Sequence, residues 1–481
     1  MRALRHLCLA SALVAASVTA RAQGTARALP DSVVRAVDAL FAQYAHSGSP
    51  GCAVGVYENG AVALARGYGF ADLNHDVPIT PATRFTVGSV TKQFTAASIA
   101  LLAQSGRLSL DDDVRKYVPE LPAYQAPVTI RHLVHHTSGV RDFWELVTLA
   151  GWRPDDGYTA DDMLNLAAHQ KGLNFTPGAE YRYSNTGYLL LGLVVRRVTG
   201  QSLRAFADSA IFRPLGMSET LYLDDHTEVV PRRAPAYAPS RGGWRIDVWN
   251  NDLVGQGGIV TSIGDLQKWD ENFYDAKVGG KDLIAQLQAP GHITGSGPMT
   301  YAFGLTVETY RGMRLVQHTG STGGYRAAIY RFPDAHTSVA MLCNASTANT
   351  GQLALRMADA VLGDRFSAPP ERVAAGGRGG RGGAAAAVSH PAPQREAALG
   401  RFRSDELLGA VWEIRAGDAP DRIAVQRARG PNDILAAEET GIRFGGRGLM
   451  LEFDAPVRGK SPGFVVNGSR VSGLRFSRVS P

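Results

Sequence analysis

The sequence predicts an α+β fold in which helices flank an antiparallel sheet and a mostly helical segment lies between its strands, followed by a small C-terminal antiparallel β domain. Three observations predict this fold. Two short apolar runs flank Asn59-Gly60, a strong hairpin signal. Helical patterns fill most of residues 111–240, and strand-like runs return over residues 301–344. Neither group of strands could bury its apolar residues alone, so we expect both in one sheet.

The first 22 residues differ from the rest of the chain. Arg2 and Arg5 precede an apolar run over residues 7–16, and Ala20-Arg21-Ala22 has the small-x-small pattern of a cleavage site. We therefore expect a signal peptide over residues 1–22 and an exported protein, either periplasmic or secreted. The apolar run is too short to span a bilayer, and no other stretch of eighteen apolar residues occurs, so we expect no integral membrane segment.

The remaining elements follow from periodicity and turn residues. Apolar positions at helical spacing predict a helix over residues 31–45, before the hairpin of residues 50–65. The next helix begins near Ser89 and ends near Gly106. Apolar periodicity then predicts helices over 129–136, 160–170, 186–199, 202–212 and 351–362, and strands over 301–310, 313–317, 325–332 and 337–344.

The amino-acid composition changes after residue 364 and divides the chain into domains. Residues 23–364 form the predicted main domain. Residues 365–394 consist mostly of Gly, Ala, Arg and Pro, a composition typical of a flexible linker. Two Arg-Gly-Gly repeats in the linker could also contact RNA, but an exported protein with two repeats favours the linker interpretation. Residues 395–481 alternate apolar and polar residues, with a hairpin at Asn467-Gly468, and predict a small β-meander or half-barrel.

Charge and cysteine content limit the function. The chain has 481 residues and a net charge of +6, which falls to +3 after removal of three arginines with the signal peptide. So small an excess argues against a nucleic-acid binder. The mature chain keeps Cys52 and Cys343, both in predicted strands. In an oxidising compartment they form either a disulfide or two buried free thiols, and the sequence leaves both open.

The stretch from Val87 to Ala97 is where we expect the chemistry. Ser89 and Lys92 lie three residues apart, so on a helix they project from the same face, and the lysine nitrogen can reach the hydroxyl. Such a pair is a nucleophile with its base. The alternative is an ordinary helix cap followed by a solvated lysine, so the assignment needs further residues elsewhere in the chain.

Two later segments supply those residues. Tyr183 and Asn185 are two apart and can face one pocket, as a proton relay and a contact to a substrate amide. The alternative is that Tyr183 packs and Asn185 caps a helix. In His318-Thr319-Gly320-Ser321 the glycine permits a ligand to approach the backbone, so a substrate could add itself as a further strand. The N–H groups of Ser89 and Ser321 would then form an oxyanion hole.

Taken together, Ser89-x-x-Lys92, Tyr183-x-Asn185 and His318-Thr319-Gly320 resemble the serine β-lactamase and penicillin-binding protein superfamily. The Tyr-x-Asn motif is similar to the class C branch, which includes class C β-lactamases, D-Ala-D-Ala carboxypeptidases, D-aminopeptidases and esterases. The resemblance covers residues 31–364. It implies an antiparallel sheet with helices on both sides plus a helical lobe, an acylated nucleophile at Ser89, and His318 with Thr319 beside the substrate carboxylate.

His318 departs from the class C β-lactamases, which have lysine at this position, whereas carboxypeptidase-like members have His-Thr-Gly. Its weaker positive charge disfavours tight binding of a β-lactam carboxylate. We therefore predict an exported serine hydrolase that forms an acyl-enzyme and hydrolyses an amide or ester, such as a D-amino-acid peptide, with β-lactams ranked lower. The alternative is a non-catalytic binding or assembly protein whose C-terminal β domain recruits a partner.

No cofactor or metal is expected. His132, His135 and His136 have helical metal-ligand spacing, but no acidic residue is placed to complete a site. The expected partner is a small-molecule or peptide substrate, not nucleic acid, and the sequence leaves the oligomeric state open.

Overall fold

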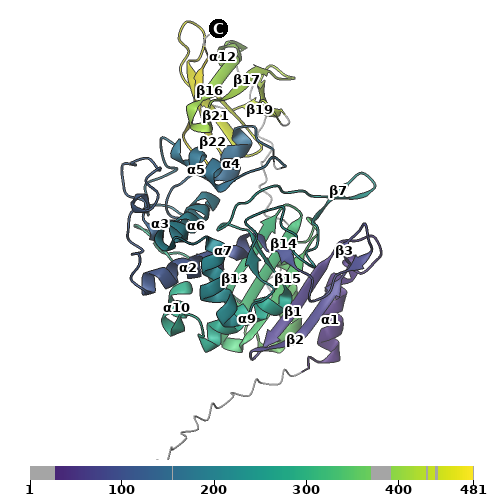
Figure 1. Ribbon diagram of the computed structural model, residues 1–481. Helices are drawn as coiled ribbons and strands as arrows, with labels where there is room; N and C mark the ends of the chain where they lie inside the picture. The colour runs from purple at the N-terminus through teal and green to yellow at the C-terminus, as the bar shows by residue number, and fades with distance from the viewer. Residues whose placement is uncertain (1–27, 154, 370–391, 430–431, 439–441, 480–481) are drawn as a thin grey trace, which may run out of the picture.

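The structure is a computed structural model that describes residues 28–153, 155–369, 392–429, 432–438 and 442–479. The predicted signal peptide and most of the predicted linker lie outside these residues. Within them, no helix has the length and apolar character needed to cross a membrane. A sheet with its covering helices forms the lower part of Figure 1, and the C-terminal β domain lies at the top, above helices α4 and α5.

The main sheet has six antiparallel strands in the order β12-β13-β14-β15-β1-β2. Early and late strands therefore share one sheet, as predicted, because β1 pairs with β15. The Asn59-Gly60 turn joins β1 to β2, and both residues have positive φ, as a two-residue hairpin turn requires. The strands span Cys52–Glu58 (β1), Ala61–Tyr68 (β2), Thr306–Tyr310 (β12), Met313–Thr322 (β13), Tyr325–Phe332 (β14) and Thr337–Cys343 (β15).

Two predicted strand boundaries were wrong. Strand β13 continues through Thr322, because His318–Thr322 pair with β14, whereas the expected strand stopped at Gln317. The expected strand from Tyr301 begins only at Thr306.

Cys52 and Cys343 lie directly opposite each other where β1 pairs with β15. The structure joins them in a disulfide that links residues 291 positions apart in the sequence. Of the two alternatives left open by the sequence, the structure therefore contains the bridge.

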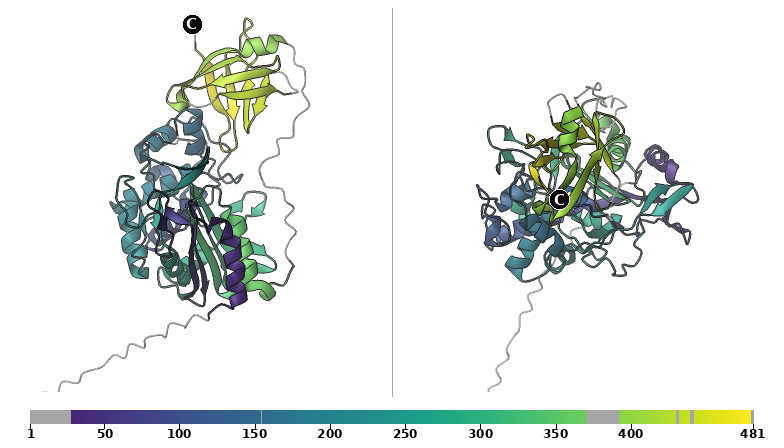
Figure 2. Two further views of the ribbon diagram at one scale, coloured as in Figure 1. Left: turned by 90° about the vertical axis from the view of Figure 1, so that its right-hand side faces the viewer. Right: turned by 90° about the horizontal axis from the view of Figure 1, so that it is seen from above.

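Helices cover both faces of the sheet (Figure 2). On one face, α1 (Asp31–Phe41) and α11 (Thr350–Leu362) pack with Val54, Val56 and Met341. On the other face, α2 (Lys92–Gln104) and α9 (Ile263–Asp275) pack with Ala53 and Leu342. Alternate residues of β1 and β15 thus enter different cores, as the two-residue repeat of a strand requires.

The helical lobe is built from α3 (Ile130–Val134), α4 (Phe143–Leu149), α5 (Ala160–Ala168) and α6 (Asn185–Thr199). The remaining helical segments are α7 (Leu203–Ala207), a π-helical turn over Asp208–Phe212, α8 (Arg213–Leu215), α10 (Gly280–Leu287), α12 (Ala392–Ala398) and short 3₁₀ turns at Ala42–Tyr44, Gly88–Thr91, Val114–Lys116, Pro333–Ala335, Gly363–Arg365 and Asp405–Leu407. Short strands lie at β3 (Phe70–Asp72), β4 (Val77–Pro78), β5 (Phe85–Thr86), β6 (Leu221–Tyr222), β7 (Tyr237–Ser240), β8 (Gly243–Ile246), β9 (Ile259–Thr261), β10 (His292–Ile293) and β11 (Gly297–Pro298).

The C-terminal domain is a closed barrel of eight antiparallel strands, not the half-barrel that the sequence also allowed. Closure comes from pairing of the first strand with the last, at Phe402 and Arg403 opposite Arg478 and Ser477. The strands are β16 (Gly400–Ser404), β17 (Ala410–Ala416), β18 (Arg422–Gln426), β19 (Asp433–Ala437), β20 (Arg443–Gly446), β21 (Leu449–Phe453), β22 (Gly463–Asn467) and β23 (Leu474–Arg478).

The barrel and the helical lobe share one hydrophobic core. Phe143 and Leu146 of α4 belong to the same buried cluster as Phe402 and Trp412 of the barrel. The indole N–H of Trp412 donates to the carbonyl of Leu149 at 2.8 Å. Burial of large aromatic side chains stabilises this contact strongly, so the barrel is packed against the lobe and is not merely tethered to it.

A buried ion pair also joins the two units. Arg141 Nη1 lies 2.6 Å from Glu406 Oε2, and both side chains are less than 5% exposed. Arg141 also donates to Gln170 Oε1 at 3.0 Å and to the carbonyl of Ser472 at 3.0 Å. The ion pair thus lies within a hydrogen-bonded network, which a buried charge needs to offset its desolvation.

Candidate active site

Ser89 lies in the 3₁₀ turn Gly88–Thr91, which leads directly into α2. Gly88 has φ of +52°, and a Cβ atom there would lie 2.6 Å from the backbone nitrogen of Ser321. A side chain at position 88 would therefore push β13 away from the turn. The glycine before Ser89 thus has a packing role between two backbone segments that are far apart in the sequence.

Lys92 lies beside Ser89 and is fully buried. Its Nζ lies 3.1 Å from Ser89 Oγ, 2.9 Å from Asn185 Oδ1 and 2.7 Å from the carbonyl oxygen of Gln256. Burial lowers the pKa of Lys92 well below 10.5, although the nearby Asp142 opposes this shift. A neutral amine has two N–H donors and one lone pair. The two carbonyl oxygens accept the two N–H bonds, and the lone pair is left for the Ser89 hydroxyl.

Asn185 is the first residue of α6, and Asp142 fixes the orientation of its amide. The amide nitrogen of Asn185 donates to Asp142 Oδ2 at 2.8 Å, so its oxygen is the atom that faces Lys92. Asp142 Oδ2 also accepts the backbone N–H of Asn185 at 2.7 Å. In addition to the predicted contact with substrate, Asn185 therefore holds the lysine. The sequence does not mark Asp142 as a site residue, because its only local signal is its position as the N-cap of α4.

Tyr183 lies over the lysine, with Lys92 Nζ 4.8 Å from the centre of its ring. His136 also packs against this ring, at a distance of 4.2 Å between ring centres. Burial raises the pKa of the Tyr183 phenol above its ordinary value, and a side-chain hydrogen bond with Ser89 opposes this shift. The tyrosine is thus a phenol in contact with the serine hydroxyl, and the amine is the group whose pKa is lowered.

His318 faces the same cavity from β13 and is almost fully buried. Its Nε2 lies 3.1 Å from the hydroxyl of Tyr301. Burial lowers its pKa to about 4. At neutral pH the imidazole is therefore uncharged, and it offers no fixed positive charge to a substrate.

The end of β13 runs beside the serine. Residues His318–Thr322 pair with β14 along one edge, whereas β12 pairs only as far as Gln317 along the other. A Cβ atom on Gly320 would lie 1.9 Å from the carbonyl of Val87 and 3.1 Å from the backbone nitrogen of Ser89. The edge that faces Ser89 thus has no partner strand among the described residues, and the predicted oxyanion donors, Ser89 and Ser321, come from segments in close contact.

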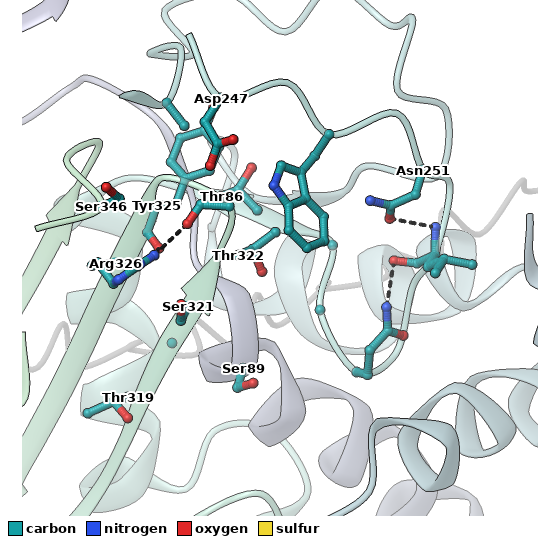
Figure 3. Close-up of a pocket in the computed structure, with 18 of the residues that line it drawn as sticks. Thr86, Ser89, Asp247, Asn251, Thr319, Ser321, Thr322, Tyr325, Arg326 and Ser346 are labelled. Atoms are coloured by element: carbon teal, nitrogen blue, oxygen red, sulfur yellow. Dashed lines mark hydrogen bonds between the residues drawn. The ribbon is translucent and has the colours of Figure 1, made fainter. Parts of the chain in front are cut away.

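These residues open into a cavity of about 1510 Å³ between the sheet and the lobe. Figure 3 shows Ser89 beside the end of β13 that carries Thr319, Ser321 and Thr322. The lining includes Ser89, Tyr183, Asn185, His318, Thr319, Gly320 and Ser321. The structure therefore brings together every predicted site residue, with Lys92 directly beneath the lining.

Two further residues escaped sequence analysis. Gln256 supplies a backbone carbonyl to Lys92 from the turn Gly255–Gly258, which the sequence marks only as glycine-rich. Arg470 lines the cavity from the barrel, with its guanidinium carbon 5.1 Å from the centre of the Tyr183 ring. The sequence held no signal for Arg470, because it lies in the C-terminal β domain, far along the chain from the other site residues.

The three histidines considered as metal ligands each bond to a different backbone group. His132 accepts the N–H of Thr129, and His136 accepts that of Ser184 at 3.1 Å. His135 contacts the carbonyl of Tyr301 at 3.4 Å. Elsewhere in the described ranges, one other group has metal-ligand spacing, formed by Asp225, His226 and Asp252. There, His226 Nδ1 lies 2.8 Å from Asp252 Oδ1, so the trio is already joined by an internal contact.

Comparisons with known proteins identify the family of this chain. The Beta-lactamase family model matches residues 37–363. The D-aminopeptidase of Cereibacter sphaeroides is 28% identical over 433 residues, which cover 88% of this chain and 76% of that protein. The D-aminopeptidase of Gluconobacter oxydans is 30% identical over 311 residues, covering 64% of this chain and 58% of the relative, so much of that relative lies outside the match.

A penicillin-binding protein homologue from Pyrococcus abyssi, described as octameric, has a similar fold. Its TM-score is 0.61 at 23% identity, and the match covers 92% of this chain and 98% of that one. The similarity therefore extends over the sheet, the helical lobe and the barrel. Because the family model spans most of the chain, the chain belongs to the Beta-lactamase family.

Proposed function

We propose that the protein is a serine hydrolase that forms an acyl-enzyme on Ser89 and transfers the acyl group to water. The observation that carries this proposal is the position of Lys92 Nζ, 3.1 Å from Ser89 Oγ, with two carbonyl oxygens accepting its other hydrogens. A buried amine with a lowered pKa can take the serine proton at neutral pH. The preferred substrate is an amide, in particular a short peptide or amide of a D-amino acid.

The proposed reaction has two steps. Ser89 Oγ attacks the substrate carbonyl carbon as its proton passes to Lys92 Nζ, and the amide C–N bond then breaks. The leaving nitrogen receives a proton through the Tyr183 hydroxyl, which contacts Ser89. Water then attacks the acyl-enzyme, gives its proton to the same pair of groups and releases Ser89. No external reactant besides water is needed.

The developing negative charge on the carbonyl oxygen needs hydrogen-bond donors. The N–H groups of Ser89 and Ser321 are proposed to supply them, since Gly88 and Gly320 let the two segments approach. Preorganised donors of this kind contribute about 10²- to 10³-fold to the rate each. The open edge of β13 at residues 318–322 would hold an extended substrate in register with Ser89.

The choice of amide substrates rests on two points. The relatives described above are D-aminopeptidases by name. In addition, the uncharged His318 gives a β-lactam carboxylate no fixed cation at the position where class C β-lactamases have lysine. Esters would react by the same steps, and β-lactams rank below both. The alternative of a non-catalytic assembly protein is less favoured, because part of the barrel packs against the helical lobe and is not free to recruit a partner.

We further propose that the protein is exported. The Cys52–Cys343 disulfide supports this proposal, because disulfides persist in oxidising compartments and are rare in the cytosol. The charge and apolar pattern of residues 1–22 predicts the same destination. Fractionation of the expressing cell, with N-terminal sequencing of the mature protein, tests this, and full-length protein retained in the cytosol would contradict it.

The experiment for the catalytic proposal compares wild type with Ser89→Ala. Both proteins are incubated with D-alanine p-nitroanilide, with a short-chain p-nitrophenyl ester and with a fluorescent penicillin. We expect wild type to hydrolyse the anilide and the ester, and Ser89→Ala to lose at least about 10³-fold in kcat/KM. Equal turnover by the two proteins would remove Ser89 from the mechanism. If the penicillin labels wild type covalently but does not label Ser89→Ala, β-lactams also reach Ser89.

A further inference from the structure

The turn that joins β22 to β23, residues 468–473, enters the active-site cavity. The sequence predicted a tight hairpin at Asn467-Gly468, but β23 begins only at Leu474, so six residues form the connection. Arg470 at its centre lines the cavity together with Ser89 and Tyr183. The barrel therefore supplies one side chain to a site whose other residues come from the main domain.

The helical lobe holds this turn by its backbone. Glu145 Oε2 accepts the N–H of Arg470 at 2.6 Å, and Asn174 Nδ2 donates to the carbonyl of Arg470 at 2.9 Å. Asn174 Oδ1 also accepts the N–H of Ser472 at 2.7 Å. A Cβ atom on Gly468 would lie 1.8 Å from Glu145 Oε1, so the glycine at this position lets the Glu145 carboxylate approach the turn. The position of Arg470 is thus fixed on both sides of its Cα atom.

The guanidinium of Arg470, in contrast, has no hydrogen-bond acceptor among the residues that the structure describes. Its side chain is 43% exposed and forms an ion pair with Asp142, in which Nη1 lies 3.7 Å from Oδ2 without a hydrogen bond. Asp142 already accepts two N–H bonds from Asn185 and one from the backbone of Trp144. The planar fork of N–H donors thus makes no hydrogen bond to a described residue, and its exposed part can donate to a ligand while the ion pair with Asp142 remains.

The charge of the cavity favours an anionic ligand. Three arginines, Arg233, Arg326 and Arg470, line it with a single carboxylate, Asp247. His318 is uncharged at neutral pH, since burial lowers its pKa to about 4. Of the three arginines, Arg470 is the one in contact with the ring of Tyr183, at 5.1 Å from its centre. It is thus the fixed cation beside the reacting groups.

We propose that Arg470 forms a carboxylate-binding subsite next to Ser89, so that the enzyme prefers amides with a carboxylate close to the scissile bond. A guanidinium binds a carboxylate through two parallel hydrogen bonds, which give both affinity and orientation. The barrel then acts as a specificity element, because it carries the cation. This inference rests on the proposed amide hydrolysis and names the substrate class more narrowly.

The carboxylate could belong to either half of the substrate. On the acyl side it would be a side-chain carboxylate, as in D-glutamic acid α-(p-nitroanilide), whose neutral isostere is D-glutamine p-nitroanilide. On the leaving-group side it would be a C-terminal carboxylate, as in D-Ala-D-Ala, whose neutral isostere is the dipeptide amide. The ratio of kcat/KM within each pair measures recognition of the charge and cancels changes in the chemical step.

The experiment measures both ratios for wild type, Arg470→Gln, Arg470→Lys and the control Arg429→Gln. Arg429 is also a barrel arginine at the interface, 3.4 Å from Asp156, but it lies outside the cavity lining. In wild type we expect the acid to exceed its amide about tenfold to a hundredfold in one pair, which is the value of a charge-assisted hydrogen bond. Arg470→Gln should bring that ratio to about one, Arg470→Lys should retain part of it, and Arg429→Gln should leave it unchanged.

Each outcome separates the subsite from the mechanism. If wild type hydrolyses the neutral members of the pairs in a Ser89-dependent way but shows no acid preference in either, the subsite is wrong and the proposed function stands. If Arg470→Gln lowers both members of a pair equally and keeps the preference, Arg470 acts on the fold or on Asp142 and not on the carboxylate. If no amide is hydrolysed by wild type, the proposed function fails as well.

Discussion

Alanine in place of Gly320 tests whether the contact between β13 and the serine turn sets the reaction geometry. The new Cβ would lie 1.9 Å from the carbonyl oxygen of Val87, which is backbone and cannot rotate away. The two segments must therefore separate by about 1.5 Å to reach an ordinary van der Waals distance. The N–H of Ser321, the next residue, moves with it, away from the position where it can meet a substrate oxyanion together with the N–H of Ser89.

The size of the effect follows from what is displaced. Loss of one oxyanion donor costs about 10²- to 10³-fold in kcat, and a shift of 1 Å at a reacting centre costs a similar factor. We therefore expect Gly320→Ala to lower kcat for D-alanine p-nitroanilide by at least about 100-fold. KM should change less, because the oxyanion that these donors stabilise forms only in the transition state.

The assay needs a control for general disruption by alanine in a glycine-rich segment. Gly257→Ala provides it, because the nearest atoms to a Cβ there are 3.9 Å away and the residue also lines the cavity. Thermal melting should show both variants folded, with Gly320→Ala less stable. If Gly320→Ala keeps a kcat within about threefold of Gly257→Ala, the proposed oxyanion site is refuted.

Three other predictions concern the interface, the disulfide and the base. Glu406→Ala should lower the free energy of unfolding by about 3 kcal/mol, because it leaves the buried Arg141 without its carboxylate. The control Glu413→Ala removes an exposed ion pair and should change that free energy by less than about 0.5 kcal/mol. Urea denaturation measures both values. Reduction of the Cys52–Cys343 bridge should cost about 2 to 5 kcal/mol, because it frees a loop of 291 residues, and an unchanged melting temperature in dithiothreitol would contradict this. The kcat/KM for an amide should fall as pH falls through the pKa of Lys92, where the amine gains a proton and loses its lone pair. Because burial lowers that pKa, this fall should lie well below pH 10.5, and a pH profile that rises only near 10.5 would show an ordinary, solvated lysine.

The sequence predicted those parts of the site that depend on local spacing. Ser89 and Lys92 meet because they are one turn apart, and Tyr183 and Asn185 are two residues apart beside the start of α6. The shared sheet could also be predicted, because apolar strands need a common core. The turn at Asn59-Gly60 forms as its residues require.

The rest depends on contacts between distant segments. Asp142, Gln256 and Arg470 reach the site from positions 43 to 285 residues away from Asn185, and each has an ordinary local role in a cap, a turn or a hairpin. Closure of the barrel depends on pairing of β16 with β23, which is likewise non-local. The length of the β22–β23 turn escaped prediction because an Asn-Gly pair signals a hairpin but does not determine where the second strand begins.

The central claim is that Ser89 becomes covalently acylated during turnover. The direct measurement is intact-mass spectrometry of acid-quenched protein after rapid mixing with a p-nitrophenyl ester of an N-acetyl-D-amino acid, followed by peptide mapping. We predict one acyl group per chain on the peptide that contains Ser89, and none in Ser89→Ala. Turnover of the ester with the acyl group on another residue, or undiminished turnover by Ser89→Ala, would contradict the account.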